Sequence, residues 1–323
     1  LYLDYGKNPG EWVANIYGGH ENLEAVEFLK HLNSIFKGRK DGAILIAEES
    51  TAWPKITGSV KEDGLGFDYK WNMGWMNDFL EYMKYDPYFR SHHYKELTFS
   101  MLYAYSEDFI LVFSHDEVVH GKKTIVDKIW GSYEEKFAQL RTLYLYMFTH
   151  PGKKLNFMGN ELAHFREWDE EKQCDWDLLK YPMHDAFHRY FAKLGELYSK
   201  TPALYETEYD WTSFQWIDAD NADENMFSYL RKNENSYYIV ILNFSPNAYK
   251  KHAFGVPEKG VYHELLNTEQ DIWGGEITEL GKMKAVEKEC NKLPYTIEVD
   301  VPAFGGVLLE LKKRKKPVKK AVK

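Results

Sequence analysis

Cysteine is scarce in this chain, and so are the features that mark metal, disulfide and membrane proteins. Only two cysteines, Cys174 and Cys290, occur among 323 residues, and their separation does not fit the ligand spacing of a zinc site. We therefore predict free thiols and a cytoplasmic location, with a disulfide between the two as the alternative. The sequence also lacks an apolar run of the roughly 18 residues that a bilayer span needs and any Asp/Asn cluster with calcium-loop spacing. We expect no membrane partner, no metal and no other cofactor.

Positive charge is concentrated at one end of the chain. The formal net charge is −9, and residues 312–323 contain eight Lys and Arg residues. Removing those eight positive charges leaves a net charge of −17 on the rest of the chain. A body of this sign repels phosphate backbones, so we expect no nucleic acid partner. We interpret the basic end as a solvated tail, with a polyanion-binding arm as the alternative.

Aromatic residues are abundant. The chain contains 24 Tyr, 19 Phe and 10 Trp, which together make 16% of its residues. Flat rings with polar tips pack against the C–H faces of sugars, so carbohydrate is the first ligand class to consider. The alternative is that these rings fill a large core. Nothing in the sequence indicates an oligomeric state.

Four short apolar runs in the first two thirds of the chain each end in a polar cluster. A run of this kind predicts a buried strand, and helical periodicity between the runs predicts βα units. Four consecutive units make half of a (β/α)8 barrel, whose strands end at one functional rim. The predicted strands are 44–47, 65–69, 109–113 and 155–158, and the predicted helices are 22–36, 73–83, 94–105, 133–149 and 186–200.

After about residue 205 the pattern changes to short alternating strands separated by Pro, Gly and Asn, which is typical of an antiparallel sandwich. The clearest strand signal is the strict alternation in residues 295–301. We therefore predict an α/β plus all-β fold with three segments: residues 1–204 form the C-terminal half of a barrel, residues 205–312 form the β-sandwich, and residues 313–323 form the basic tail.

Two carboxylates follow neighbouring predicted strands. Glu48 comes directly after the first run, and Asp116 follows the third run beside His115. Carboxylates from converging strand ends can flank a glycosidic bond, one as a proton donor and one as a stabiliser of developing positive charge. Glu49 is adjacent to Glu48 and should point the opposite way, so only one of the two is expected to face the centre. The alternative is that all four side chains are solvated loop residues.

Several longer motifs resemble the bacterial 1,4-α-glucan (glycogen) branching enzymes of the α-amylase family. The most specific is the nine-residue segment 114–122 (SHDEVVHGK), and the resemblance also rests on segments 47–51, 69–76 and 157–161. Further matches at 10–12, 18–25 and 166–168 extend it over nearly the whole chain. The resemblance implies that the N-terminal module, the first barrel strands and the nucleophilic aspartate precede Leu1, so we expect the chain alone to be inactive.

The resemblance also implies the roles of the site residues. Glu48 matches the general acid/base, Asp116 the stabilising aspartate and His115 a histidine that binds the sugar at the cleavage point. The implied reaction is a retaining double displacement that cleaves an α-1,4-glucan and transfers the chain to a 6-hydroxyl. The implied substrates are glycogen, amylose and amylopectin.

From the same segments we predict further contacts to substrate by Glu49, Trp71 and Asn72. Trp53, Trp71 and Trp75 are candidate platforms that hold an acceptor glucan and exclude water, and core packing is their alternative role. Two other functions stay open. One is a related glucan hydrolase or trehalose-forming enzyme, and the other is a non-catalytic fragment that binds glucan.

Overall fold

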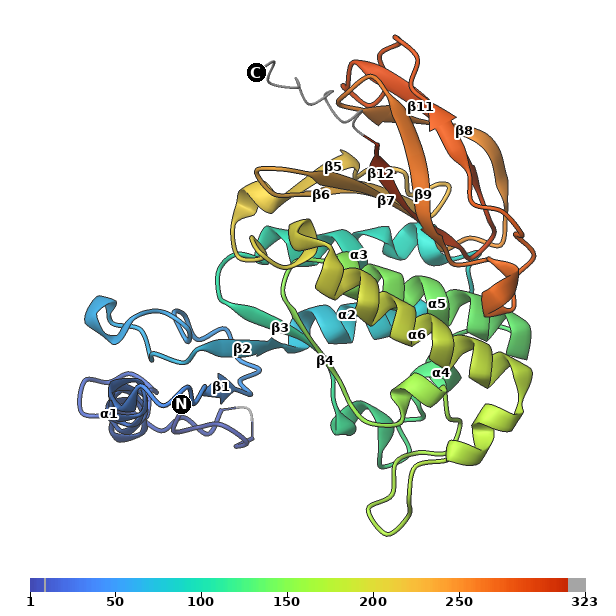
Figure 1. Cartoon of the computed structure of the whole chain (residues 1–323). Helices are drawn as coiled ribbons and strands as arrows, with labels where there is room; N and C mark the ends of the chain where they lie inside the picture. Colours follow the sequence, from blue (N-terminus) through green and yellow to red (C-terminus); the bar gives the residue numbers. More distant parts are fainter. Residues whose placement is uncertain (9, 313–323) are drawn as a thin grey trace, which may run out of the picture.

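The computed structural model describes residues 1–8 and 10–312, so the predicted tail at 313–323 lies outside the described residues. A parallel α/β part is followed by antiparallel strands (Figure 1). The helices are α1 (Leu23–Arg39), α2 (Met73–Lys84), α3 (Tyr94–Phe99), α4 (Ile125–Lys128), α5 (Tyr133–Thr149) and α6 (Pro182–Lys200). The strands are β1 (Ile46–Ala47), β2 (Tyr69–Asn72), β3 (Phe109–Phe113), β4 (Lys153–Asn156), β5 (Phe214–Asp218), β6 (Met226–Lys232), β7 (Tyr237–Asn243), β8 (Tyr249–Val256), β9 (Val261–Asn267), β10 (Lys282–Lys284), β11 (Tyr295–Val301) and β12 (Gly306–Leu311).

The first four strands form one parallel sheet in the order β1-β2-β3-β4. Ala47 pairs with Lys70, and Lys70 pairs with Phe109 on the next strand. Every residue of β3 is buried, as expected for an inner strand of a parallel sheet that is covered on both faces. Because all four strands run the same way, their C-terminal ends lie at one edge of the sheet.

Helices α2, α3, α5 and α6 form a layer between this sheet and the antiparallel strands (Figure 1). Helix α5 begins at a capping box formed by Ser132 and Glu135 and is buried over most of its length. It is apolar on nearly every side because it contacts β3 and α6 as well as β7 and β12. In the part of the chain that the structure covers, no helix has the length and apolar character of a membrane span.

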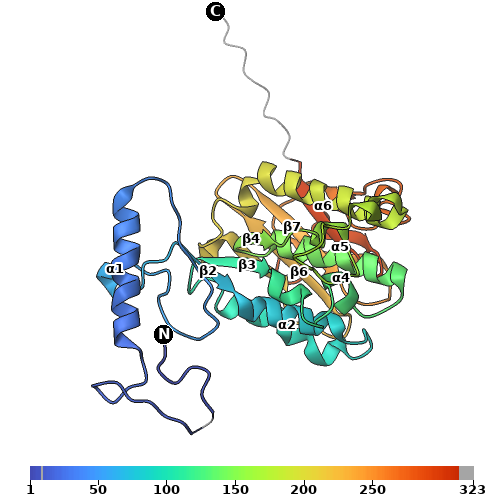
Figure 2. The ribbon, with the colours of Figure 1, turned by 90° about the horizontal axis from the view of Figure 1, so that it is seen from below.

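Helix α1 lies to one side of the other helices (Figure 2), and β1 is next to it (Figure 1). Asn22 caps its first turn by accepting a hydrogen bond from the amide of Ala25. Val26 of α1 packs in a small separate cluster with Ile56 and Leu65, while Phe28 on another face is 64% exposed. The N-terminal region thus contacts the body chiefly through the β1–β2 pairing and its connecting loop.

The antiparallel strands form a sandwich. A six-stranded sheet has the order β10-β9-β12-β7-β6-β5, and β8 pairs with β11 as a two-stranded ribbon. The ribbon packs on the sheet through Phe254, Ile297 and Val299, which contact Ile239 and Leu309 in a second core. The other face of the six-stranded sheet packs on the helices, so this sheet lies between two cores.

The predicted α/β plus all-β fold class is confirmed, and several element bounds are corrected. The second strand is Tyr69–Asn72 and not 65–69. Gly66 has a φ of +80°, which is typical of a turn, and Leu65 is buried against α1. The fourth strand is Lys153–Asn156, two residues earlier than predicted. No α-helix separates β1 from β2, where only a 3-10 turn at Val60–Glu62 occurs. Strands β8 and β10 were not predicted.

Three buried arginines hold the helices to the antiparallel sheet. Arg90 donates to the carbonyl oxygen of Phe244 at 2.9 Å, and Arg231 donates to that of Thr149. Arg141, on α5, is 2% exposed and donates to the carbonyl of Thr268 at 2.6 Å. Such charges are stable in the interior only because every contact satisfies a donor.

Arg141 pairs with a carboxylate as well as with carbonyl oxygens. Its guanidinium also reaches the carbonyl of Trp273 at 3.2 Å and the carboxylate of Glu269 at 2.5 Å. Burial raises the pKa of Glu269, and the charge of Arg141 opposes that shift. Removing the arginine would therefore leave two carbonyls without their donor and one carboxylate without its counter-ion.

We predict that Arg141→Met lowers the free energy of unfolding by about 3 kcal/mol, because unpartnered buried acceptors and charges are costly. Equilibrium unfolding in urea measures this change. Arg189→Met is the matched control, since Arg189 also bonds a carboxylate (Asp185) and a carbonyl (Ile272) but is exposed. The control should lose less than about 1 kcal/mol. Equal losses in the two variants would contradict the role assigned to Arg141.

Candidate active site

Glu48 and Glu49 follow directly after β1, and the structure separates their environments. Glu48 is exposed at the edge of the sheet. Glu49 is half-buried, and its Oε1 accepts a hydrogen bond from the amide of Thr51 at 2.8 Å. Successive side chains of an extended chain point to opposite sides, which explains the difference. Glu48 is therefore the carboxylate that is free to meet a ligand at this strand end.

Asp116 and His115 lie in a short 3-10 helix, His115–Val118, that begins one residue after β3. Ser114 and Glu117 form a capping box: the Glu117 carboxylate accepts bonds from the amide and the hydroxyl of Ser114, each at 2.7 Å. Glu117 is buried, whereas the side chains of His115 and Asp116 are 46% and 43% exposed. The cap thus fixes the turn and presents the two middle residues outward.

His115 and Asp116 contact each other and adjacent aromatic rings. Nε2 of His115 lies 3.4 Å from Oδ1 of Asp116. The His115 ring is 5.8 Å from the ring of Phe157 and 6.4 Å from that of Trp168. These rings come from the segment after β4, so residues of two strand ends form one patch. A polar pair beside partly buried rings is suited to hydroxyl groups and a sugar face.

Lysine side chains hold the rest of the loop after β3. Lys122 donates from Nζ to the carbonyl of Asp116 at 2.8 Å, and Lys128 donates to the carbonyls of Glu117 and Lys123. Burial and, to a smaller extent, the charge of nearby Lys84 lower the pKa of Lys128 to about 8, while the carboxylate of Glu117 opposes the shift. Main-chain carbonyls of the loop thus accept hydrogen bonds from lysines of the same loop, and these bonds hold its backbone in place.

A carboxylate from the segment after β4 also holds this loop. Glu167 accepts hydrogen bonds from the amides of Gly121 and Lys123, at 2.9 and 2.6 Å. Gly121 and Lys123 have φ of +78° and +66°, so their amides are turned outward to a common acceptor. The amide of Trp168 adds a bond to the carbonyl of Val118 at 2.9 Å. The loop that carries Asp116 is therefore supported from two strand ends.

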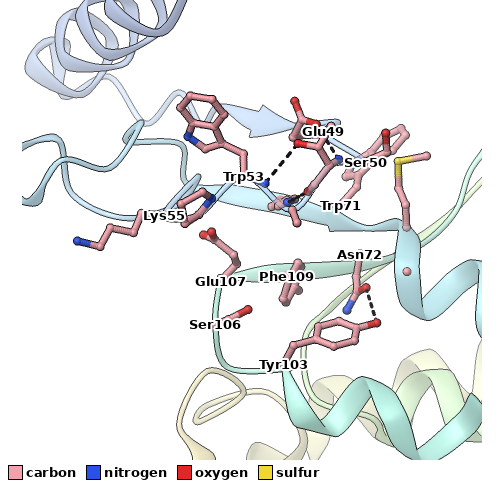
Figure 3. A pocket seen from close by; sticks show the side chains of 16 residues that line it. Glu49, Ser50, Trp53, Lys55, Trp71, Asn72, Tyr103, Ser106, Glu107 and Phe109 are labelled. Carbon is pink, nitrogen blue, oxygen red and sulfur yellow. Dashed lines mark hydrogen bonds between the residues drawn. The ribbon is translucent and has the colours of Figure 1, made fainter. Parts of the chain in front are cut away.

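Three other predicted residues line a pocket of about 530 Å³ at the ends of β1 and β2 (Figure 3). Glu49, Trp71 and Asn72 line it together with Lys70 and Glu107. Burial lowers the pKa of Lys70, and the carboxylates of Glu107 and Glu49 oppose that shift. The remaining lining residues are Ser50, Thr51, Ala52, Trp53, Pro54, Lys55, Met73, Gly74, Tyr103, Ser106 and Phe109.

Asn72 has a structural task in this pocket. Its Oδ1 accepts a hydrogen bond from the amide of Trp75 at 2.9 Å and so caps helix α2. Tyr103 donates to the same oxygen at 3.4 Å (Figure 3). Asn72 is 2% exposed, so the contact to substrate predicted for it would involve its amide nitrogen, which has no partner in the described part of the chain.

The three tryptophans proposed as acceptor platforms lie in different environments. Trp75 is 1% exposed and packs against Phe79 and Phe113 in the main core, so the core-packing alternative is correct for this residue. Trp53 and Trp71 are partly exposed and line the pocket of Figure 3. They remain candidate platforms.

The sheet brings the predicted catalytic pair to one edge and leaves them on different strands. Glu48 follows β1 and Asp116 follows β3, with only β2 between them. Neighbouring strands are about 4.8 Å apart, so these two strand ends are separated by roughly 10 Å. Neither Glu48, His115 nor Asp116 lines the pocket of Glu49, Trp71 and Asn72. The predicted site residues thus form two adjacent groups at one edge.

The sequence analysis missed the residues that position the loop of Asp116. The Ser114–Glu117 cap was visible as a Ser-x-x-Glu pattern, a standard helix-start signal. Glu167 gave no such signal, because the amides it holds lie 46 and 44 residues earlier in the chain. Both cysteines are free, as predicted. No group of three or more His, Cys, Asp or Glu residues suited to a metal ion occurs within residues 1–8 and 10–312.

Known proteins resemble this chain in sequence. The 1,4-alpha-glucan branching enzyme GlgB 1 of Clostridium perfringens (strain SM101 / Type A) is 48% identical over 99% of the chain. The branching enzyme GlgB of Butyrivibrio fibrisolvens is 46% identical over 98% of it. The family described as "Alpha amylase, C-terminal all-beta domain" matches residues 216–312. This chain is a homologue of the branching enzymes. The resemblance inferred from the sequence motifs is therefore confirmed.

The branching-enzyme homologue spans about half the length of these curated relatives, 49% and 50% for the two named above. Solved structures agree on the fold. The crystal structure of the α-amylase from Geobacillus thermoleovorans, complexed with acarbose, superposes with a TM-score of 0.61 at 13% identity and covers 90% of this chain and 58% of its own. The α-amylase from H.orenii gives 0.57 at 14% identity, again over 90% of this chain and 58% of its own.

The contact of Glu167 with the loop of Asp116 should depend on pH. Hydrogen bonds from the amides of Gly121 and Lys123 lower its pKa in the folded state. A lowered pKa means that this contact stabilises the loop above the unfolded pKa and is lost as the pH falls through the folded pKa. We expect the two amides to be protected from hydrogen exchange at neutral pH and to lose that protection in acid.

Glu167→Gln should lower the protection factors of both amides several-fold at neutral pH, because the neutral amide is a weaker acceptor. It should also remove the further loss of protection in acid. Exchange followed by NMR or mass spectrometry measures this. Glu170→Gln, a change at an exposed neighbour, should leave both amides unaffected. Unchanged protection in Glu167→Gln would show that the carboxylate does not hold the loop.

Proposed function

We propose that this chain is part of an enzyme that forms α-1,6 branches in α-1,4-glucan. Its relatives carry the name 1,4-alpha-glucan branching enzyme, and the chain spans about half of their length. The observation that carries the proposal is the exposure of Glu48, His115 and Asp116 at one edge of a parallel sheet. Exposed carboxylates at the strand ends of one parallel sheet are typical of a glycoside-cleaving site.

In the proposed reaction Glu48 protonates the glycosidic oxygen of an α-1,4-glucan while a nucleophilic carboxylate attacks the anomeric carbon. That nucleophile comes from the half of the enzyme that this chain does not span. Glu48 then removes the proton from a 6-hydroxyl of an acceptor glucan, which attacks the glucosyl enzyme and forms the branch. The free exposure of Glu48 supports this assignment over Glu49, whose carboxylate is engaged by Thr51.

Asp116 and His115 stabilise the reaction in this proposal. The aspartate faces the positive charge that develops on the sugar ring, and the histidine bonds a sugar hydroxyl. Their 3.4 Å contact and the rings of Phe157 and Trp168 support a single binding patch. The bonds of Glu117 and Glu167 to their loop agree with a site that is held in place before substrate arrives.

The substrates in this proposal are glycogen, amylose and amylopectin. Trp53 and Trp71 provide ring faces near Glu49 for an acceptor chain. Transfer to a sugar requires that water be excluded, which aromatic surfaces favour. The enzyme is proposed to work in the cytoplasm, where its two free cysteines would stay reduced.

The isolated chain is expected to be inactive. A retaining enzyme without its nucleophile cannot form the covalent intermediate, so the purified 323 residues should not raise the number of α-1,6 branches in amylose or amylopectin. Isoamylase debranching followed by chain-length analysis measures this. A measurable rise in branching by the chain alone would contradict the proposed division of catalytic groups.

A chimera tests the site itself. These 323 residues would replace the matching half of the 48% identical Clostridium perfringens enzyme, and the chimera should branch amylose. Glu48→Gln and Asp116→Asn in the chimera should each lower kcat by about 10²-fold or more with little change in KM, because both act in the transition state. Exposed Glu134→Gln, on α5, should leave kcat unchanged.

Two outcomes would overturn parts of the proposal. A larger loss in Glu49→Gln than in Glu48→Gln would move the acid/base role to Glu49. Release of reducing ends without new branch points would favour the glucan hydrolase alternative.

A further inference from the structure

The segment after β4 contains Cys174, a free and partly exposed cysteine. Cys174 lines a small enclosed cavity together with Gly159, His164, Arg166 and Trp168. The cavity has a volume of about 10 Å³, room for about one water molecule. A cysteine at a surface cavity has no significance by itself, so the groups around it decide whether it can react.

His164 provides a buried base in this cavity. It is 6% exposed, and its Nδ1 lies in hydrogen-bond contact with the carbonyl oxygen of Arg166. A carbonyl only accepts, so Nδ1 carries the proton and Nε2 keeps its lone pair in the neutral ring. Nε2 is buried and has no hydrogen-bond partner among the residues described. The lone pair is therefore available to a proton donor in the cavity.

The thiol and this lone pair face the same small space. A Cβ atom placed on Gly159 would lie 3.0 Å from Nε2 of His164 and 3.8 Å from Sγ of Cys174. The absence of a side chain at Gly159, which has a φ of +95°, keeps that space open. The guanidinium of Arg166 also lines this space, but it is paired with the carboxylate of Asp175 at 2.6 Å. The unpartnered base is therefore the group in this cavity that can take the proton of the thiol.

The second cysteine is in a different environment. The thiol of Cys290 lies 3.1 Å from Oδ1 of Asn291 and 3.8 Å from the carbonyl of Ala253. Both atoms are acceptors, so they stabilise the protonated thiol. Cys290 is partly exposed as Cys174 is, which makes it a control for exposure within the same chain.

We propose that Cys174 is a site of reversible thiolation by small disulfides, with His164 as its base. The thiol passes its proton to Nε2 of His164 through the one water that the cavity can hold, because the two atoms are not directly hydrogen-bonded, and the sulfur attacks one sulfur of the incoming disulfide. One S–S bond forms and one breaks, and the leaving thiolate takes the electron pair and then the proton. A small thiol reverses the step by the same exchange.

An adduct at Cys174 would disturb the loop of Asp116. The cavity cannot hold an added group, so the segment 164–175 must shift when the sulfur is modified. The same segment carries Glu167 and Trp168, which hold Gly121, Lys123 and Val118 of that loop. Modification of Cys174 would thus loosen the loop of Asp116 without touching it directly. This effect would occur whether or not the chain takes part in glucan branching.

The full chain with one cysteine at a time tests the proposal. Cys290→Ser leaves Cys174, and Cys174→Ser leaves Cys290. Each is mixed at pH 7 with dithiodipyridine, an uncharged disulfide whose released thione absorbs light. An ordinary thiol is only a few per cent ionised at this pH, so Cys174 should react at least about tenfold faster than Cys290. Equal rates would overturn the proposal.

The role of His164 is tested in the Cys290→Ser background. His164→Gln should slow the reaction of Cys174 to near the rate of Cys290, and an unchanged rate would remove His164 from the mechanism. If this variant does not fold, the comparison of the two single-cysteine chains still decides whether Cys174 is reactive. Hydrogen exchange at Gly121 and Lys123 should rise several-fold after thiolation and return after treatment with dithiothreitol. Unaltered exchange would show that the adduct does not reach the loop.

Discussion

The parallel register of β1, β2, β3 and β4 is the constraint on which the site depends. Parallel strands that pair side by side end at the same edge, whatever connects them. Glu48 and Asp116 are 68 positions apart in the sequence and reach the same edge for this reason alone. Strand β3 pairs with β2 on one side and with β4 on the other, so its register fixes the position of both neighbours.

A strand end fixes where a loop begins but not where its side chains point. In the loop after β3 the direction comes from local bonds: the Ser114–Glu117 cap closes the turn and leaves His115 and Asp116 outward. The carboxylate of Glu167 then holds the distal part of the loop from the next strand end. The position of this loop therefore depends on two carboxylates, those of Glu117 and Glu167, that are not part of the patch formed by His115 and Asp116.

Some parts of this arrangement could be predicted from the sequence and others could not. Strand β3 has the predicted bounds because it is an unbroken apolar run, and helix α5 has them because Ser132 caps its start and Pro151 follows its end. β2 was placed four residues early, since Leu65 is buried by α1 and not by a sheet, and β4 begins at lysines whose charges are met by Glu208. That Glu48 and Asp116 share one edge of the sheet could be predicted from the alternation of strands and helices alone. The contacts of Glu167 and of Arg141 could not be predicted, because each joins segments far apart in the chain.

The buried arginines have a consequence for divergence. Arg90, Arg141 and Arg231 bind main-chain carbonyl oxygens of the segments that they hold. Every amino acid carries that oxygen, so mutations can replace the side chains of those segments while the anchoring bonds persist. A docking interface built on backbone recognition tolerates drift that an interface of matched side chains would not, and this agrees with a shared architecture at only 13% and 14% identity to the two α-amylases.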